Sequence, residues 1–227
     1  MTKIKYLLPF LALMLTLGVV SAYTPPTGTV AYANLTLNES WSSVASAYVQ
    51  QNLTINESNY TNYINYNGSI ANFEFTYANG TVIPSWIESN QSNQTLVWLN
   101  ITNTTTNVYL DFFNMTTNML NSSGTNGIGE APQLSPTYAE YDDGNNVFSF
   151  YSDFKGTTLS SKWTASGTPT VDNGISLNGG GGTVYIQSAN EYDPQTQIMD
   201  FYSYVVDIIC IIGFIYCQIL LDIGRCY

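Results

Sequence analysis

The feature that most constrains the fold of this chain is an Asn-Gly pair between two stretches of alternating apolar residues. Side chains alternate between the two faces of a strand, so a period of two predicts strands with one apolar face. Asn79-Gly80 supplies the positive φ that a two-residue turn requires, and we expect a β-hairpin over residues 73–86. In that register the facing pairs are Tyr77 with Val82, Phe75 with Pro84, and Phe73 with Trp86.

The residues that follow extend the β pattern. Since proline cannot donate to a strand ladder, Pro84 predicts that the returning strand lies at a sheet edge or a bulge. Apolar residues on both faces of 95–101 indicate a strand buried inside a sandwich, and 108–113 form a further strand. Polar loops are expected at 89–94 and 102–106. We therefore predict an all-β protein that begins with an antiparallel β-sandwich.

Residues 1–22 have the pattern of a secretory signal. Lys3 and Lys5 precede the apolar run 7–20, and small or aliphatic residues stand at the end of the segment. We expect a signal helix that is removed by cleavage after Ala22, which places the mature chain outside the cell or at its surface. The alternative is an uncleaved membrane anchor, although the run is shorter than the roughly 20 residues that a bilayer requires.

Charge and composition exclude several classes of protein. The 227 residues include no histidine, 5 basic residues and 16 acidic residues, which gives a net charge of −11. Without histidine there is no Ser-His-Asp or Cys-His site and no imidazole-ligated metal. Affinity for nucleic acid comes mainly from clustered Lys and Arg, so we expect no nucleic-acid partner. Loss of Lys3 and Lys5 with the signal leaves 3 basic against 16 acidic residues, a charge of −13.

Asn-x-Ser/Thr triplets, the acceptors of N-linked glycans, cluster in the first half of the chain. Thirteen lie within 88 residues, and none follows in the remaining 106. Because the signal directs the chain to where glycans are added, and acceptors belong on surface loops, we interpret 34–121 as a glycosylated outer surface. The acceptors are Asn34, Asn38, Asn52, Asn56, Asn59, Asn67, Asn79, Asn90, Asn93, Asn100, Asn103, Asn114 and Asn121.

Several short motifs follow one another along the first half: Phe73-Glu74-Phe75, Asn79-Gly80-Thr81, Ile83-Pro84-Ser85-Trp86-Ile87-Glu88, Leu96-Val97-Trp98-Leu99 and Val108-Tyr109-Leu110. Their order resembles a domain of unknown function from archaeal and bacterial cell-surface proteins. In that family the domain precedes a concanavalin A-like lectin/glucanase module, and 150–159 with Lys162-Trp163 resembles the start of such a module. The stretches 129–134 and 138–144 look like the joining segment of archaeal members. The resemblance implies two extracellular β-sandwich modules and carries no assigned catalytic residues.

These patterns divide the chain into a signal peptide (1–22), a leader (23–39), the surface domain (40–128), the joining segment (129–146), a partial lectin-like module (147–203) and a hydrophobic tail (204–227). In the second module we expect Val171 to pair with Ile175 around the loop 172–174, and a further strand at 184–186. A jelly-roll needs about eight strands. Residues 147–203 supply four or five, so we predict a partial concanavalin A-like jelly-roll.

The tail is rich in isoleucine and holds all three cysteines, Cys210, Cys217 and Cys226. Three interpretations stay open: the product of a shifted reading frame or truncated gene, a membrane anchor through 204–221, and a buried pair of strands. Two polar residues interrupt the apolar run, which makes the anchor a marginal span. The cysteine spacings fit no ordinary zinc motif.

Without histidine, catalysis would have to rest on carboxylates. Glycoside hydrolases need a pair of them across the scissile bond, and the sequence pattern shows no such spaced pair. Glu140, Asp142 and Asp143 form the densest acidic group and are weak candidates for an extracellular calcium site. The alternative for this group is a solvated turn at 143–145.

Aromatic side chains offer a route to sugar binding. Trp86, Trp98, Trp163 and Tyr185 could stack on sugars, but alternating aromatics in strands mostly form cores, and we assign Trp86 and Trp98 to the core. We expect an exported, N-glycosylated cell-surface protein with a structural, adhesive or glycan-binding role, and neither catalysis nor a cofactor. Its partners would be cell-envelope components or neutral glycans. The alternative is the remnant of a secreted glycoside hydrolase with a concanavalin A-like fold.

Overall fold

The computed structural model describes residues 22–37, 43, 45–178 and 184–190, together with the strands at 208–212 and 215–219. Helix in these residues is limited to a 3₁₀ turn at Glu57–Asn59 and the four-residue helix α1 at Gly144–Val147. Strands make up the rest of the regular structure, so the predicted all-β class is confirmed. The chain divides into two compact units, Met1–Asp153 and Phe154–Tyr227.

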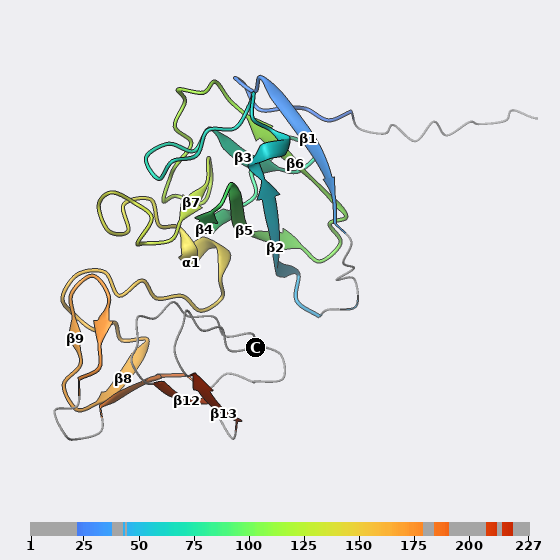
Figure 1. The fold of residues 1–227 in the computed structure, drawn as a ribbon. Coiled ribbons are helices and arrows are strands. Elements are labelled where there is room, and N and C mark those ends of the chain that lie inside the picture. The colour runs from blue at the N-terminus through green and yellow to red at the C-terminus, as the bar shows by residue number, and fades with distance from the viewer. Residues whose placement is uncertain are drawn as a thin grey trace, which may run out of the picture. The chain divides into compact units, whose positions relative to one another are not determined.

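Two sheets form the first unit (Figure 1). One has the strand order β1-β6-β3, with β1 at Ala31–Thr36, β6 at Asn107–Phe112 and β3 at Phe73–Thr76. The other has the order β2-β5-β4-β7, with β2 at Tyr48–Asn56, β5 at Gln94–Thr102, β4 at Ser85–Gln91 and β7 at Gly129–Glu130. Neighbouring strands are antiparallel except β4 and β7, which are parallel. Strands β1 and β2 each lie at an edge.

Residues of both sheets contribute to one hydrophobic core. Phe73 and Phe75 of β3 are fully buried there, together with Val108 and Leu110 of β6 and alternate residues of β5. Burial of each such side chain contributes about 1.5–3 kcal/mol, so this cluster holds the unit together. The strand predicted at 95–101 is confirmed, with one face buried and the other only partly buried.

The turn at Asn79-Gly80 forms, but it contains three residues instead of the two expected. The Gly80 N–H donates to the Tyr77 carbonyl at 2.9 Å, and Gly80 has a φ of +79°. Of the two predicted turn residues only Gly80 has a positive φ, whereas a type I′ turn needs two. The extra residue shifts the register, so that Thr76 rather than Tyr77 pairs with Val82.

The returning segment leaves β3 after Ile83, because the chain changes sheets at Pro84. The Ile83 N–H still donates to Phe75 of β3, but the Pro84 carbonyl accepts a bond from Asn100 of β5 at 2.9 Å. The expected pairing of Pro84 and Trp86 with β3 is therefore wrong. Pro84 also does not mark an edge, since β4 continues between β5 and β7. A residue without an N–H is tolerated just where a strand begins.

The two-residue hairpin turn lies instead at Ser92-Asn93. These residues have φ values of +54° and +61°, as a type I′ turn requires. Strands β4 and β5 pair on either side of it, out to Gln91 opposite Gln94. The polar loop predicted at 89–94 is therefore wrong, since most of it is strand.

The segment 129–146 packs within the first unit. Strand β7 begins it and pairs with β4, and the Ala131 N–H donates to the Ile87 carbonyl at 2.8 Å. Ala131 and Val147 are buried with Trp86 in a second, smaller core cluster. This packing fixes the acidic residues that follow β7.

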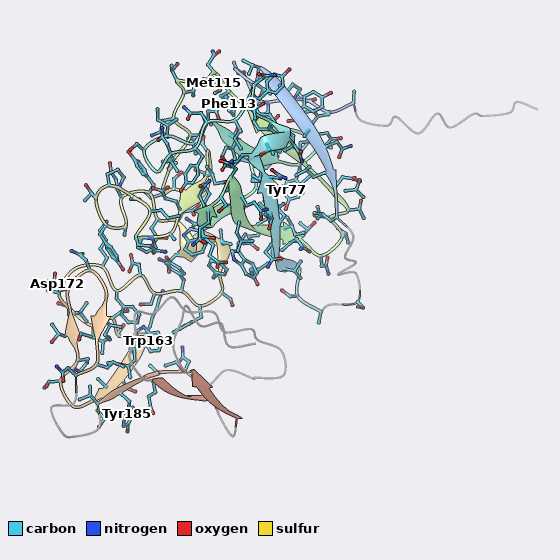
Figure 2. All side chains as sticks on the ribbon, viewed as in Figure 1. Tyr77, Phe113, Met115, Trp163, Asp172 and Tyr185 are labelled. Atoms are coloured by element: carbon cyan, nitrogen blue, oxygen red, sulfur yellow. The ribbon has the colours of Figure 1, made fainter. Side chains whose placement is uncertain are left out.

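The second unit has short strand pairs. Strand β8 at Trp163–Ser166 pairs with β11 at Tyr185–Ser188, and β9 at Thr170–Val171 pairs with β10 at Ile175–Ser176. Val171 lies opposite Ile175, which confirms the predicted pairing. The Trp163 ring, labelled in Figure 2, lies 5.5 Å from that of Phe154 between centroids.

The predicted signal helix at 1–22 lies outside the described residues except for Ala22. In the tail, β12 at Ile208–Ile212 pairs antiparallel with β13 at Ile215–Ile219, and the remainder of 204–227 lies outside the described residues. Within the part of the chain that the structure describes, no helix has both the length and the apolar character needed to cross a membrane.

Candidate functional site on the outer face of the three-stranded sheet

The outer face of the β1-β6-β3 sheet carries polar and aromatic side chains. Ala31, Ala33 and Leu35 of β1 pack against the core, so the alternate residues of this strand point to the other face. The strand registers gather on that face Tyr32, Asn34 and Thr36 from β1, Asn107, Tyr109 and Asp111 from β6, and Glu74 and Thr76 from β3. Of these residues the sequence analysis had assigned a role only to Asn34.

Three tyrosine rings meet on this face. Tyr23, from the segment before β1, stacks on Tyr109 with ring centroids 3.8 Å apart and planes at 1°. Tyr32 meets the Tyr23 ring edge-on, with centroids 4.7 Å apart at 65°, and Tyr32 is 54% exposed. The rings form a partly open aromatic surface beside Asn34, whose register partner is Tyr109.

Two buried carboxylates lie on the same face. Glu74 and Asp111 stand directly opposite each other on β3 and β6, and they are 2% and 0% exposed. The Tyr23 hydroxyl donates to Oδ1 of Asp111, and the Thr76 hydroxyl donates to Oδ2 at 2.7 Å. The Gly127 N–H donates to Oε2 of Glu74 at 2.7 Å. These donors offset the cost of burying two acids.

Burial raises the pKa of both carboxyls above the ordinary range, and the neighbouring Asp111 raises that of Glu74 further. Burial, followed by the bond to Asp111, also raises the pKa of Tyr23. The pair escaped the sequence analysis because its members come from strands far apart in the chain. The only sequence signal for this pair was an acidic residue among the alternating polar positions of each of the two strands. In this arrangement Asp111 fixes the segment before β1 through its bond from Tyr23.

Most of the predicted glycan acceptors are on the surface. Those exposed are Asn34, Asn52, Asn56, Asn59, Asn67, Asn79, Asn93 and Asn114, and those partly buried are Asn90, Asn100, Asn103 and Asn121. Asn38 lies outside the described residues. The expectation that Asn79, Asn90, Asn93 and Asn103 fall in turns holds for all of them except Asn90, which lies on β4.

Four acceptors share one local geometry. In Asn56, Asn67, Asn79 and Asn121 the side-chain Oδ1 accepts the backbone N–H of the Ser or Thr two residues later, at 2.8–3.1 Å. This turn uses the oxygen of the amide. The nitrogen, which is the atom that carries an N-linked glycan, takes no part in that bond.

Asn90 has the opposite geometry. Its Nδ2 donates both to Glu57 and to Thr95, the latter at 2.8 Å. Thr95 is fully buried, and its hydroxyl donates to the same Glu57 carboxylate at 2.5 Å. A glycan on Asn90 would have to break this network.

The acidic group Glu140, Asp142 and Asp143 is not gathered into a cation site. Asp142 accepts bonds from the Trp86 indole and the Tyr151 hydroxyl at 2.9 Å, and from the backbone N–H of Gly144 at 3.0 Å. Glu140 is exposed. Among the described residues, no three His, Cys, Asp or Glu side chains are placed to hold a metal ion.

The alternative of a solvated turn at 143–145 is also wrong for its first residue. Asp143 is 3% exposed, and its Oδ1 has no hydrogen-bond partner among the described residues. This oxygen lies against Gly129, where an added Cβ would come within 1.8 Å of it. Burial, and then the neighbouring Asp142, raise the pKa of Asp143 to about 8.

The tryptophans of the first unit serve packing. Trp86 is 8% exposed and lies 5.3 Å from the Phe148 ring between centroids, so its assignment to the core is confirmed. Trp98 is partly buried against the same cluster, and its indole donates to Glu88 at 2.6 Å. Tyr185 of the second unit, labelled in Figure 2, is 47% exposed.

Comparison with known protein families, curated proteins and solved structures found no match to this chain.

Proposed function

We propose that this chain is an exported, N-glycosylated cell-surface protein with a structural or adhesive role that extends to binding neutral glycans, without catalysis. The observation that carries the proposal is the presence of exposed acceptor asparagines on an edge strand of each sheet. Asn34 lies on β1, and Asn52 and Asn56 lie on β2. The protein acts outside the cell, after cleavage behind Ala22.

Glycans on these edge strands would prevent the sheets of two copies from pairing. An edge strand presents unpaired N–H and C=O groups, which can pair with the edge of another chain. A sugar on Asn34 or Asn52 would keep a second copy from approaching that edge. Such protection suits a protein that is held at high density in a cell envelope.

The proposal includes a finer account of the fold. The core shared by the two sheets supports an antiparallel β-sandwich for the first unit. On the resemblances of the motifs between 73 and 110 and of 150–159 with Lys162-Trp163, we assign 40–128 to the surface domain and 147–203 to the partial concanavalin A-like module that follows it. Attachment to a membrane through 204–221 belongs to the same proposal.

Exposed aromatic rings support the glycan-binding part. Tyr48, Tyr63 and Tyr185 are 46–57% exposed, and such rings can stack on neutral sugars without any charge. The acidic chain would repel polyanionic glycans. The proposed function does not include catalysis, because Glu74 and Asp111, the acids of the outer face, are buried and hydrogen-bonded.

A glycan array, run with and without calcium beside an assay of reducing-sugar release, tests the role. We expect binding to neutral polysaccharides and no released sugar. An array without signal would remove the glycan-binding part and leave the structural role. Sugar release that Asp111→Asn or Glu74→Gln abolishes would overturn the proposal and favour the glycoside hydrolase alternative.

A further inference from the structure

Asn34 lies beside two of the three tyrosines. Tyr32 precedes it by two residues on the same face of β1, and Tyr109 is directly opposite on β6. The Leu37 N–H donates to the Thr106 carbonyl at 2.8 Å. Hydrogen-bonded pairs recur at every second residue of an antiparallel strand, so Asn34, three residues before Leu37, does not belong to one. Asn34 and Tyr109 are therefore a non-hydrogen-bonded pair, the kind whose side chains approach most closely, with Cα atoms about 4.5 Å apart.

The rings beside Asn34 are held in place. Tyr23 covers one face of Tyr109, and the hydroxyl of Tyr23 is fixed by Asp111 and by Thr76 at 3.0 Å. Tyr32 is in turn held edge-on against Tyr23. A rigid aromatic surface loses little conformational entropy when something packs on it.

The amide of Asn34 is open to modification. Its side chain is exposed, and it has no hydrogen-bond partner in the part of the chain that the structure describes. The Thr36 hydroxyl of the same triplet donates across the sheet to Asn107 at 3.0 Å. The acceptor, its threonine and the rings thus share one face of a regular strand pair.

We propose that the sugar linked to Asn34 packs its C–H face on the ring of Tyr32, beside Tyr109. The tyrosine cluster is then the surface that binds the protein's own glycan. This inference rests on the glycosylation in the proposed function. Sugar C–H groups carry partial positive charge and aromatic faces partial negative charge, so the two surfaces attract and exclude water from each other. The sugar then covers the most exposed ring of the cluster.

A thermal double-mutant cycle on the glycosylated protein tests the contact. Tyr32→Thr keeps a strand-forming residue and should lower the Tm by roughly 2–4 °C when Asn34 carries its glycan. In the Asn34→Gln background the same change should have a much smaller effect, limited to the lost ring contacts with Tyr23 and Tyr109. Asn79→Gln is the matched control, because Asn79 is an exposed acceptor in a turn. It should leave the full effect of Tyr32→Thr in place.

Equal effects of Tyr32→Thr with and without Asn34 would overturn the inference. A second readout is NMR: ring currents should shift the C–H protons of the Asn34-linked sugar upfield, and Tyr32→Thr should abolish that shift. Glycopeptide mass spectrometry separates the two levels of the argument. A bare Asn34 beside glycans on other acceptors defeats this inference alone, whereas bare asparagines at every acceptor defeat the proposed glycosylation as well.

Discussion

At the residue scale, the burial of several acidic side chains is the feature that could not be predicted from the sequence. Glu74, Asp111 and Glu130 are at most 2% exposed, although acidic residues ordinarily lie at the surface. Glu130, for example, accepts bonds from the hydroxyls of Tyr66 and Ser135, each at 2.8 Å. Apart from Ser135, the donors come from segments distant in the chain, so no local pattern could have predicted which acids are buried.

Replacing Tyr23 by Phe should lower the free energy of unfolding by about 1–2 kcal/mol. The variant keeps the stack on Tyr109 but removes the hydroxyl that donates to Asp111, which leaves a buried carboxylate with one donor fewer. Tyr23→Ala should cost more, because the stack is lost as well. Urea unfolding measures both. If Tyr23→Phe is as stable as the wild type, the hydrogen bond to Asp111 contributes nothing in solution.

Asp143 should make the stability depend on pH. Its pKa is raised to about 8 in the folded protein, against about 3.9 in an unfolded chain, because burial disfavours the charge. Its contribution to stability is therefore complete below about pH 4 and is lost as the pH rises through about 8. Asp143→Asn removes this titration. Urea unfolding at about pH 5 and about pH 9 should show a smaller loss in the variant than in the wild type, and parallel profiles would contradict the assignment.

At the scale of strands and turns, the local sequence pattern correctly predicted features that depend on neighbouring residues alone. The strands at 95–101 and 108–113 and the pairing of Val171 with Ile175 are confirmed. The failures concern partner choice. Phe73 alternates as a hairpin strand would, yet β3 pairs with β6, and β4 pairs with β5. Because the pairing of β3 with β6 joins segments distant in the chain, the change of sheet at Pro84 has no local signature beyond the missing N–H.

Gly80→Val should destabilise the first unit by at least about 1–3 kcal/mol, since a β-branched residue resists a positive φ. A Cβ at Gly80 would also come within 2.5 Å of the Thr24 carbonyl oxygen. Asn79→Ala should cost less, because it removes only the bond from the Thr81 N–H to the Asn79 side chain at 3.0 Å. Thermal melting compares the two. Equal melting temperatures for Gly80→Val and wild type would show that the turn is assigned wrongly.

At the scale of the whole molecule, the sequence predicted an all-β chain with its acceptors gathered in the first half. The structure adds which of those acceptor side chains are exposed and which are held in hydrogen bonds. That property depends on strand pairing, as Asn90 shows: the sequence placed it in a loop, and the structure places it on β4 with its amide bonded to Glu57 and Thr95. Glycan occupancy is therefore where the fold and the proposed function can be tested together.

Glycopeptide mass spectrometry of the protein purified from its own cells is the most direct test of the account. We predict a chain that starts at Tyr23, a mass well above the 25.1 kDa of the sequence, glycans on exposed acceptors such as Asn34 and Asn79, and a bare Asn90. Retention of Met1 with no modification on any acceptor would contradict the central claim of an exported glycoprotein.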